Sequence, residues 1–363
     1  MRLIAALGAR ANVVKFGPLM PEFARARISC DFAFTGPASL ARPDDIGALS
    51  VFYGVELAPP LWYLDVGDGT RATRTGRAMV AFEDLFSTVR PDAVMVVGDS
   101  DASLAAAISA AKAGLPVVHL EAGLRCGDLR VPEEVNRVLM SRIASVHLTP
   151  TEGALENLED EGVEPERIHF VGNSVAEFAL RTLDDIRQLK PAAELGFANK
   201  GYVLAALHRP ENLDDPDRLA AIMDGLGSLP LPVLLADSYD VRAALMTQHV
   251  PLPVRVRAIG EMPYSSMLAL TRDAAAVVTD SGGLQEEACV LCVPCLTVRD
   301  CTEHTATIEA GANRLVAADS DAMHDALADA ISRKPAWASP KRWDRAVSDR
   351  VVRIIRRGVP QLV

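Results

Sequence analysis

The sequence predicts an α/β protein with two doubly wound domains, whose parallel sheets face a central crevice. Three observations favour this fold class. Short apolar runs alternate with stretches of helical length along the whole chain, which is the pattern of strand–helix–strand units. Apolar runs at residues 93–97 and 116–120 enclose an Ala-rich helical stretch, and such a crossover connects parallel strands. The length of 363 residues, 49% of them hydrophobic, suits two full cores.

The first half contains the elements of one complete sheet. Residues 2–7 read as the first strand, and a helix is expected at 13–27 after the turn that follows it. Residues 37–69 are expected to be a loop because the Pro59-Pro60 pair breaks regular structure. Further strands are predicted at 30–34, 93–97, 116–120, 146–149 and 168–172, and further helices at 74–89, in the Ala-rich stretch, at 133–143 and up to 158.

The second half repeats this rhythm. A helix at 175–190 precedes Pro191, so the domain boundary is placed there, between residues 1–175 and 176–345. Strands are predicted at 202–207, 233–235, 254–259, 275–279, 293–298 and 315–317, and helices at 219–226, 265–271, from 284 onward, at 323–331 and at 343–355.

Composition excludes several classes of protein. The formal net charge is −11, which argues against a nucleic-acid binder because phosphate contacts need clustered Lys and Arg. No apolar run approaches the roughly 20 residues of a membrane span, and residues 1–8 read as a strand rather than a signal peptide. A cytoplasmic protein without a membrane partner is therefore expected.

Cys289, Cys292 and Cys295 have the spacing C-x-x-C-x-x-C, which also occurs in iron–sulfur ligation. Cys289 and Cys292 end a predicted helix, and Cys295 lies in an apolar run. Free Cys is a common small buried residue, so buried thiols are favoured over a metal or a cluster.

Three acids of the first half follow strands or begin a helix. Asp99 and Glu121 come directly after predicted parallel strands, and Glu133 begins a helix behind Pro132. Ligands of such sheets bind beyond the carboxyl ends of the strands, where paired acids can divide into an acid and a base. Alternatively, Glu133 only stabilises its helix from the first turn. Arg10 and Lys15 lie near a helix start after the first strand, as phosphate ligands or as surface charges.

The second half offers an anion site and a histidine. Ser281-Gly282-Gly283 lies between a strand and a helix, where glycines let a phosphate approach backbone N–H groups. Glu287 lies one turn further on, where a carboxylate can accept hydrogen bonds from ribose; an ordinary turn with acids at a helix start is the alternative. The turn is not GxGxxG, so no nicotinamide cofactor is expected. His208 ends a strand, as an acid/base group, a phosphate partner or a structural histidine.

Taken together, the chain resembles the UDP-N-acetylglucosamine 2-epimerase family over nearly its whole length. The motifs that carry the resemblance are G-D-S-D-A-S at Gly98, H-L-E-A-G-L-R at His119, P-E-E-V-N-R at Pro132, P-T-E at Pro150, G-N-S-V at Gly172, H-R-P-E-N at His208 and D-S-G-G-L-Q-E-E at Asp280. The resemblance implies the glycosyltransferase-B fold, with two Rossmann-like domains and a last helix, residues 346–363, that crosses back to the first. It also implies homodimers without a metal or cofactor.

The reaction implied by the resemblance removes the proton at carbon 2 of a UDP-sugar, eliminates UDP to give a 2-acetamidoglucal, and adds UDP back after reprotonation on the other face. Such chemistry needs an acid, a base and anion stabilisation. Family catalytic positions match Asp99, Glu121, Glu133 and His208. Substrate positions match Arg10, Lys15, Ser281, Gly282, Gly283 and Glu287; Arg137 of the P-E-E-V-N-R motif is assigned with them, and Met267 falls where the family contacts uracil.

Several loops depart from the family pattern. The family's G-T-R-P-E is Gly8-Ala9-Arg10-Ala11-Asn12 here, and its T-E-R-P-E is Thr302-Glu303-His304-Thr305-Ala306. The allosteric Gln-His-Arg is Pro37-Ala38-Ser39, so no activation by UDP-N-acetylglucosamine is expected. A specialised sugar, the hydrolysing version of the reaction, a glycosyltransferase of the same fold and a non-catalytic binder stay open as alternatives.

Overall fold

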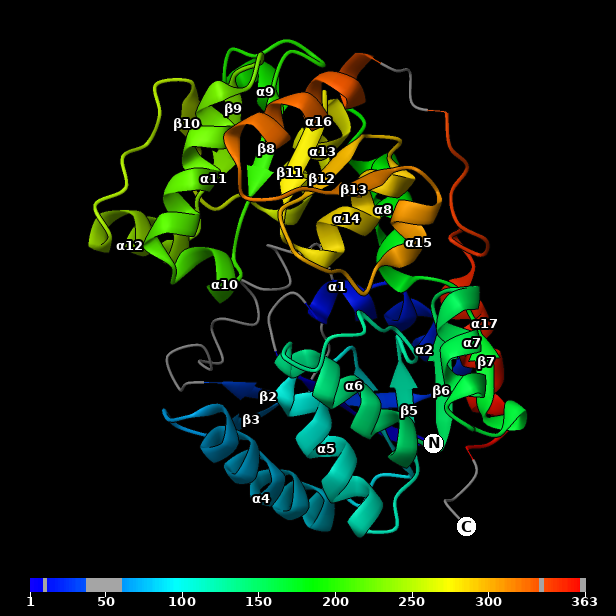
Figure 1. The fold of residues 1–363 in the computed structure, drawn as a ribbon. Helices are drawn as coiled ribbons and strands as arrows, with labels where there is room; N and C mark the ends of the chain where they lie inside the picture. Colours follow the sequence, from blue (N-terminus) through cyan, green and yellow to red (C-terminus); the bar gives the residue numbers. More distant parts are fainter. Residues whose placement is uncertain (9–11, 37–60, 333–335, 360–363) are drawn as a thin grey trace. The chain divides into compact units, whose positions relative to one another are not determined.

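The computed structural model describes residues 1–8, 12–36, 61–332 and 336–359. The chain forms two compact units, which are described separately. Unit 1 comprises Met1–Phe178 together with Lys341–Val363, and unit 2 comprises Ala179–Pro340. Each unit is built on one sheet, and every strand pair in both sheets is parallel, as expected for doubly wound domains (Figure 1).

Unit 1 has a seven-stranded sheet among the described residues, in the order β3-β2-β1-β4-β5-β6-β7. The reversal of strand order beside β1 is the topological switch point at which ligands of such sheets bind. The strands are β1 (Arg2–Leu7), β2 (Ser29–Gly36), β3 (Leu61–Asp65), β4 (Ala93–Val97), β5 (Val117–Leu120), β6 (Val146–Thr149) and β7 (Ile168–Phe170).

Helices α4, α5 and α6 cover one face of this sheet, and their apolar side chains form a continuous core with β1, β4 and β5. Ser100 begins the central helix of the three because its hydroxyl accepts a hydrogen bond from the Ser103 N–H. The helices of this unit are α1 (Asn12–Phe16), α2 (Leu19–Ala26), α4 (Arg71–Val89), α5 (Asp101–Lys112), α6 (Pro132–Ile143), α7 (Glu152–Asp160), the 3₁₀ turn Pro165–Arg167, α8 (Ser174–Asp185, which runs on into unit 2) and α17 (Val347–Arg356).

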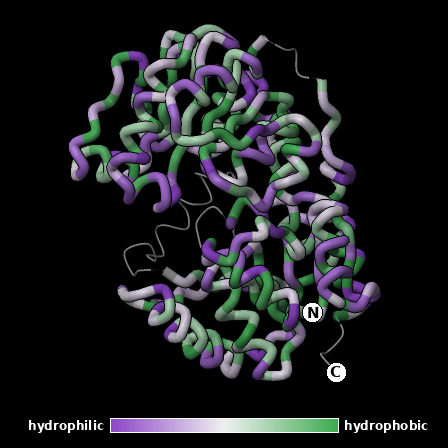
Figure 2. Tube along the Cα trace, viewed as in Figure 1, coloured by the Kyte–Doolittle hydropathy of each residue, from purple (hydrophilic) through white to green (hydrophobic). Residues whose placement is uncertain are grey.

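Unit 2 has a six-stranded sheet among the described residues, in the order β10-β9-β8-β11-β12-β13. Helices α11 and α16 cover one face of this sheet, and α13 and α14 cover the other. In Figure 2, green hydrophobic segments alternate with purple hydrophilic ones along the trace of this unit. The strands are β8 (Val203–Ala206), β9 (Val233–Ala236), β10 (Val256–Ala258), β11 (Ala276–Thr279), β12 (Cys295–Thr297) and β13 (Asn313–Leu315). The helices are α9 (Pro191–Glu194), α10 (Pro210–Leu213), α11 (Pro216–Ser228), α12 (Tyr239–Thr247), α13 (Tyr264–Asp273), α14 (Gly282–Val290), α15 (Thr305–Glu309) and α16 (Ser320–Ser332).

Two local predictions were wrong. The helix expected at residues 13–27 is two helices, because Gly17 and Pro18 separate α1 from α2 and Pro18 occupies the position before α2. The stretch 37–69 is not all loop, because β3 pairs with β2 as the edge strand of the sheet.

Candidate functional site

In unit 1, Gly98 makes the turn that precedes Asp99 and lies beside Glu121. It follows β4 with a φ of +59°, a left-handed conformation that glycine adopts without strain. A Cβ built on Gly98 would lie 3.0 Å from Lys15 Nζ and 3.4 Å from Glu121 Oε2. The turn therefore favours glycine, and a larger residue would press on the two charged groups beside it.

Lys15 and Glu121 form a short ion pair beside this turn. Lys15 Nζ lies 2.5 Å from Glu121 Oε2, and the Glu121 side chain is 3% exposed. Lys15 comes from α1, after β1, and Glu121 follows β5, so both lie at carboxyl ends of strands as predicted. The structure thus joins a predicted catalytic acid with a predicted substrate-binding cation.

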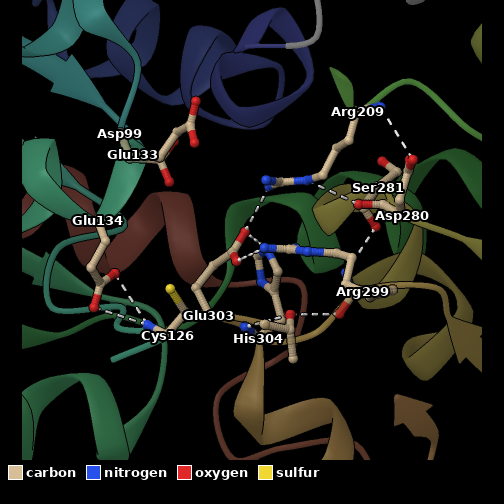
Figure 3. A network of polar contacts seen from close by, with 12 residues as sticks. Asp99, Cys126, Glu133, Glu134, Arg209, Asp280, Ser281, Arg299, Glu303 and His304 are labelled. Atoms are coloured by element: carbon tan, nitrogen blue, oxygen red, sulfur yellow. Dashed lines mark hydrogen bonds and ion pairs between the residues drawn. The ribbon is translucent and has the colours of Figure 1, made fainter. Parts of the chain in front are cut away.

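Asp99 is held by Arg137 from α6. Arg137 Nε donates a hydrogen bond of 2.8 Å to Asp99 Oδ2, and the guanidinium also pairs with Glu134. Glu134 accepts hydrogen bonds from the backbone N–H groups of Cys126 and Gly127 (Figure 3). Arg137 is buried while the Asp99 side chain is 30% exposed. The Asp99 carboxylate is therefore accessible to solvent although its partner is not.

Glu133 lies in the first turn of α6 and is partly exposed. Its Oε1 accepts a hydrogen bond of 2.9 Å from Arg71, at the start of α4. The neighbouring Glu134 is buried and accepts hydrogen bonds from the backbone of residues 126 and 127, which gives it a structural role. Glu133 is the member of the two left accessible for chemistry.

His119 forms a hydrogen bond with the backbone of Gly98. The ring is buried, and Nε2 lies 2.8 Å from the Gly98 carbonyl, which can only accept, so Nε2–H donates. Burial lowers the pKa of His119 to about 4, against the opposing effect of this hydrogen bond. A neutral His119 therefore holds the peptide that carries the turn.

In unit 2, Asp280 orients His208. Asp280 is fully buried after β11, and its carboxylate accepts hydrogen bonds from the N–H groups of His208 and Arg209 and from the Asn212 amide. His208 Nδ1 lies 2.9 Å from Asp280 Oδ1, while the His208 side chain is 53% exposed. Burial acts to raise the pKa of Asp280, but the hydrogen bonds and charge of His208, with Asn212 and Arg209, outweigh it and lower the pKa. The ionised Asp280 thus fixes the tautomer that presents Nε2 of His208 outward.

Ser281, Gly282 and Gly283 form the predicted anion-binding turn. Ser281 is the N-cap of α14, where its hydroxyl accepts from the Leu284 N–H. A Cβ on Gly282 would lie 2.3 Å from His304 Nε2, whereas a Cβ on Gly283 would meet nothing within 4 Å. Gly283 is therefore the residue whose open backbone a phosphate can approach.

Glu287 and Met267 lie further along the same part of unit 2. Burial raises the pKa of Glu287 to about 8, with the Tyr264 hydroxyl opposing and the charge of Glu286 adding to the effect. A carboxyl group that is protonated near neutral pH can both donate to and accept from ribose hydroxyls. Met267 of α13 packs against the hydrophobic core that Tyr202 and Leu204 contribute to, which gives it a packing role whether or not it also contacts a base.

Glu303 lies at the centre of a network that sequence reasoning did not assign to the site. Its carboxylate accepts from Arg299 Nη2 at 2.7 Å and lies 3.6 Å from Arg209 Nη2 and 3.2 Å from His304 Nε2 (Figure 3). Arg209 also donates to the Asp280 carbonyl. The signal available in the sequence was that Arg209 belongs to the H-R-P-E-N motif and that Glu303 and His304 belong to the altered T-E-H-T-A loop.

Arg10 lies outside the described residues. Among those that are described, no group of three or more His, Cys, Asp and Glu side chains is arranged to hold a metal ion.

Cys289 and Cys295 are buried free thiols whose pKa values burial raises to about 12, and Cys292 is exposed. No helix in the described part of the chain is long and apolar enough to cross a bilayer.

Comparison with known proteins agrees with the motifs. The family model described as UDP-N-acetylglucosamine 2-epimerase matches residues 47–356. The UDP-N-acetylglucosamine 2-epimerase of Methanocaldococcus jannaschii is 32% identical over 99% of this chain and 100% of its own. The UDP-2,3-diacetamido-2,3-dideoxy-D-glucuronate 2-epimerase of Pseudomonas aeruginosa is 33% identical over 88% of this chain and 90% of its own.

Solved structures give the same result. The crystal structure of the Methanocaldococcus jannaschii enzyme in complex with UDP-GlcNAc and UDP matches with a TM-score of 0.89 at 31% identity, covering 99% of this chain and 100% of that chain. The two all-parallel α/β domains are thus of the glycosyltransferase-B type that the resemblance implied. The matches span nearly the full chain and include the motifs at Asp99, His208 and Ser281, and the chain therefore belongs to the UDP-N-acetylglucosamine 2-epimerase family.

Proposed function

We propose that the protein is a nucleotide-sugar 2-epimerase that inverts carbon 2 of a UDP-linked 2-acetamido sugar. The reaction removes the carbon-2 proton, eliminates UDP to form a 2-acetamidoglucal, and returns UDP after reprotonation on the opposite face. The observation that carries the proposal is the cluster at Gly98, where Lys15, Glu121 and Asp99 lie together, in a chain that aligns over 99% of its length with an enzyme of this name.

The carboxylates of unit 1 are proposed as the acid/base groups. Glu121, Asp99 and Glu133 all lie at the carboxyl ends of strands or the start of α6, each beside one basic side chain. A proton on carbon 2 next to an acetamido group is weakly acidic, so its removal needs a positioned base and a second group that returns a proton. Lys15 and Arg137 orient two of these acids.

The groups of unit 2 are proposed to bind UDP. The Ser281–Gly283 turn offers backbone N–H groups and the positive end of the α14 dipole to the diphosphate. Exposed His208, oriented by Asp280, is proposed to stabilise or protonate the departing phosphate. Glu287 is proposed to bind ribose hydroxyls, as its position within the family motif implies.

The direct test is proton exchange in deuterated water. The protein is incubated with UDP-N-acetylglucosamine and followed by ¹H and ³¹P NMR. Deuterium at carbon 2 with UDP still attached to two epimeric sugars is the expected result. Release of UDP with a free epimerised sugar would indicate the hydrolysing reaction, and the absence of exchange would contradict epimerisation of this substrate and favour a glycosyltransferase or a binding protein.

A second substrate has a specific observation in its favour. The identities to the UDP-N-acetylglucosamine and the UDP-diacetamido-glucuronate relatives are nearly equal, 32% and 33%, and His304 replaces the Arg of the family motif. The same exchange experiment with UDP-2,3-diacetamido-2,3-dideoxy-D-glucuronate therefore tests a specialised sugar. The substrate with the higher kcat/KM identifies the sugar class.

The homodimer and the cytoplasmic location expected above stay predictions. Size-exclusion chromatography with light scattering measures the mass of the assembly, for which two copies of the 38.8 kDa chain are expected. Fractionation of cells that produce the protein tests its location.

A further inference from the structure

His304 lies between two carboxylates in the loop that leads to α15. Its ring Nδ1 is 2.9 Å from Glu286 Oε1 of α14, and Nε2 is 3.2 Å from Glu303 Oε1. The side chain is 8% exposed and the two acids are 2% and 6% exposed. Figure 3 shows His304 beside Glu303, within the network that includes Arg209 and Arg299.

This geometry determines the protonation state of the ring. A carboxylate only accepts hydrogen bonds, so a nitrogen that faces one must carry a proton. Both ring nitrogens of His304 face carboxylates, which requires the imidazolium form. Burial alone would lower the pKa of His304, but the charges of Glu286 and Glu303 and the hydrogen bonds to them outweigh burial and raise the pKa to about 10.

The ring also lies against the anion-binding turn. A Cβ on Gly282, the first residue of α14, would be 2.3 Å from His304 Nε2. The imidazolium therefore packs on the backbone whose N–H groups and dipole favour an anion. The two carboxylates that face His304 belong to a wider network, because Glu303 also pairs with Arg299 and Arg209.

We propose that His304 is a positioning residue of the diphosphate site, which as a buried imidazolium holds Glu286 and Glu303 in place and gives the first turn of α14 a permanent positive charge. The inference rests on the proposed binding of a UDP-sugar. It goes beyond that function because it gives the altered T-E-H-T-A loop a specific role. His304 keeps a cation at the position where the family pattern has Arg, and its side chain contacts two carboxylates of the same unit.

The inference predicts that loss of the His304 charge weakens the binding of ligands that carry phosphates more than the binding of the nucleoside. A purely structural residue would affect both kinds of ligand alike. The charge acts on the phosphates and not on the nucleoside. His304→Gln removes the charge but keeps a side chain that can hydrogen-bond, and His304→Arg restores a cation. We expect the Gln variant to raise the Kd for UDP about tenfold and the KM more than it lowers kcat, while the Kd for uridine changes less than about twofold.

The experiment measures binding of UDP by calorimetry and of uridine by NMR titration to the wild type and both variants, with melting temperatures to check folding. Equal weakening of UDP and uridine, or unchanged UDP binding by the Gln variant, would overturn the inference, as would failure of His304→Arg to recover UDP affinity in a folded protein. A wild type that binds no UDP would instead refute the proposed function, and the inference with it. Nitrogen-15 shifts of His304 at pH 8 supply an independent reading, because a neutral ring would contradict the imidazolium.

Discussion

Lys15 Nζ and Glu121 Oε2 lie 2.5 Å apart although 106 positions separate the two residues in the chain. Glu121 is held with a φ of 67°, a left-handed conformation that is uncommon for a residue with a side chain. Such strain persists where the surroundings over-determine it, and it is concentrated at functional sites. The pair therefore holds the Glu121 carboxylate, a proposed acid/base group, in one orientation after β5.

Replacing Glu121 by Gln is expected to reduce turnover by roughly 10²-fold or more, because an amide of the same shape cannot exchange a proton. Turnover is measured by the deuterium-exchange assay. Glu152→Gln is the matched control, because Glu152 forms an exposed ion pair with Lys341 at the start of α7. Near-normal turnover of the Glu121 variant would remove this residue from the acid/base mechanism.

Replacing Asp280 by Asn is expected to reduce kcat by roughly 10²-fold, because the amide is neutral and offers one acceptor oxygen in place of two, so it no longer fixes the tautomer of His208. Asp237→Asn serves as the control, since Asp237 is also buried after a strand of the same sheet and accepts from the Gly260 N–H, with no histidine beside it. Both variants should lose stability by about 1–3 kcal/mol in urea unfolding. If both lowered kcat equally, His208 would not depend on Asp280 for its role.

Ala substitutions at Gly282 and Gly283 are expected to differ sharply. Gly282→Ala places a Cβ 2.3 Å from His304 Nε2 and should cost about 1–3 kcal/mol. Gly283→Ala meets nothing within 4 Å and should leave the melting temperature unchanged or slightly raised. Thermal unfolding of the two variants without nucleotide checks this. Equal melting temperatures would show that His304 is not packed against Gly282 in solution.

The buried His147 predicts a loss of stability in acid. Burial lowers its pKa to about 3 from an ordinary value of 6.5, so the unfolded chain binds a proton that the folded chain does not. The free energy of unfolding should therefore rise with pH across the window from about 3 to 6.5, by up to about 1.4 kcal/mol per pH unit for this group.

His147→Leu should flatten this slope, whereas replacing the exposed His324 by Gln should leave it unchanged. Urea unfolding at pH 7 and pH 5 measures the slope for each protein. A His147→Leu variant with the slope of the wild type would contradict a neutral buried ring.

Most of the fold could be predicted because buried parallel strands read as short apolar runs. The prediction of two all-parallel α/β domains is confirmed. The edge strand β3 was missed because it follows Pro59 and Pro60, which signal a loop. The break between α1 and α2 was missed because apolar residues continue on both sides of Gly17-Pro18.

The strand pattern of the sequence predicted those candidate site residues that directly follow a strand. Asp99, Glu121 and His208 follow strands, and their positions needed only the strand pattern. The partners did not follow from it. The pairs Lys15–Glu121, Arg71–Glu133 and His304–Glu286 join distant segments and depend on side-chain packing that no local pattern encodes. The catalytic and binding roles of these residues stay predictions.

Helix α17 returns to unit 1 after the whole of unit 2. Ser348 donates hydrogen bonds of 2.7 and 2.8 Å, from its N–H and its hydroxyl, to buried Glu177, and Trp343 donates to the Pro150 carbonyl. During synthesis the amino-terminal domain therefore leaves the ribosome with the Glu177 carboxylate still lacking these donors. These contacts can form only after residues 341–356 emerge, so the amino-terminal domain is expected to complete its folding after the second domain has been synthesised.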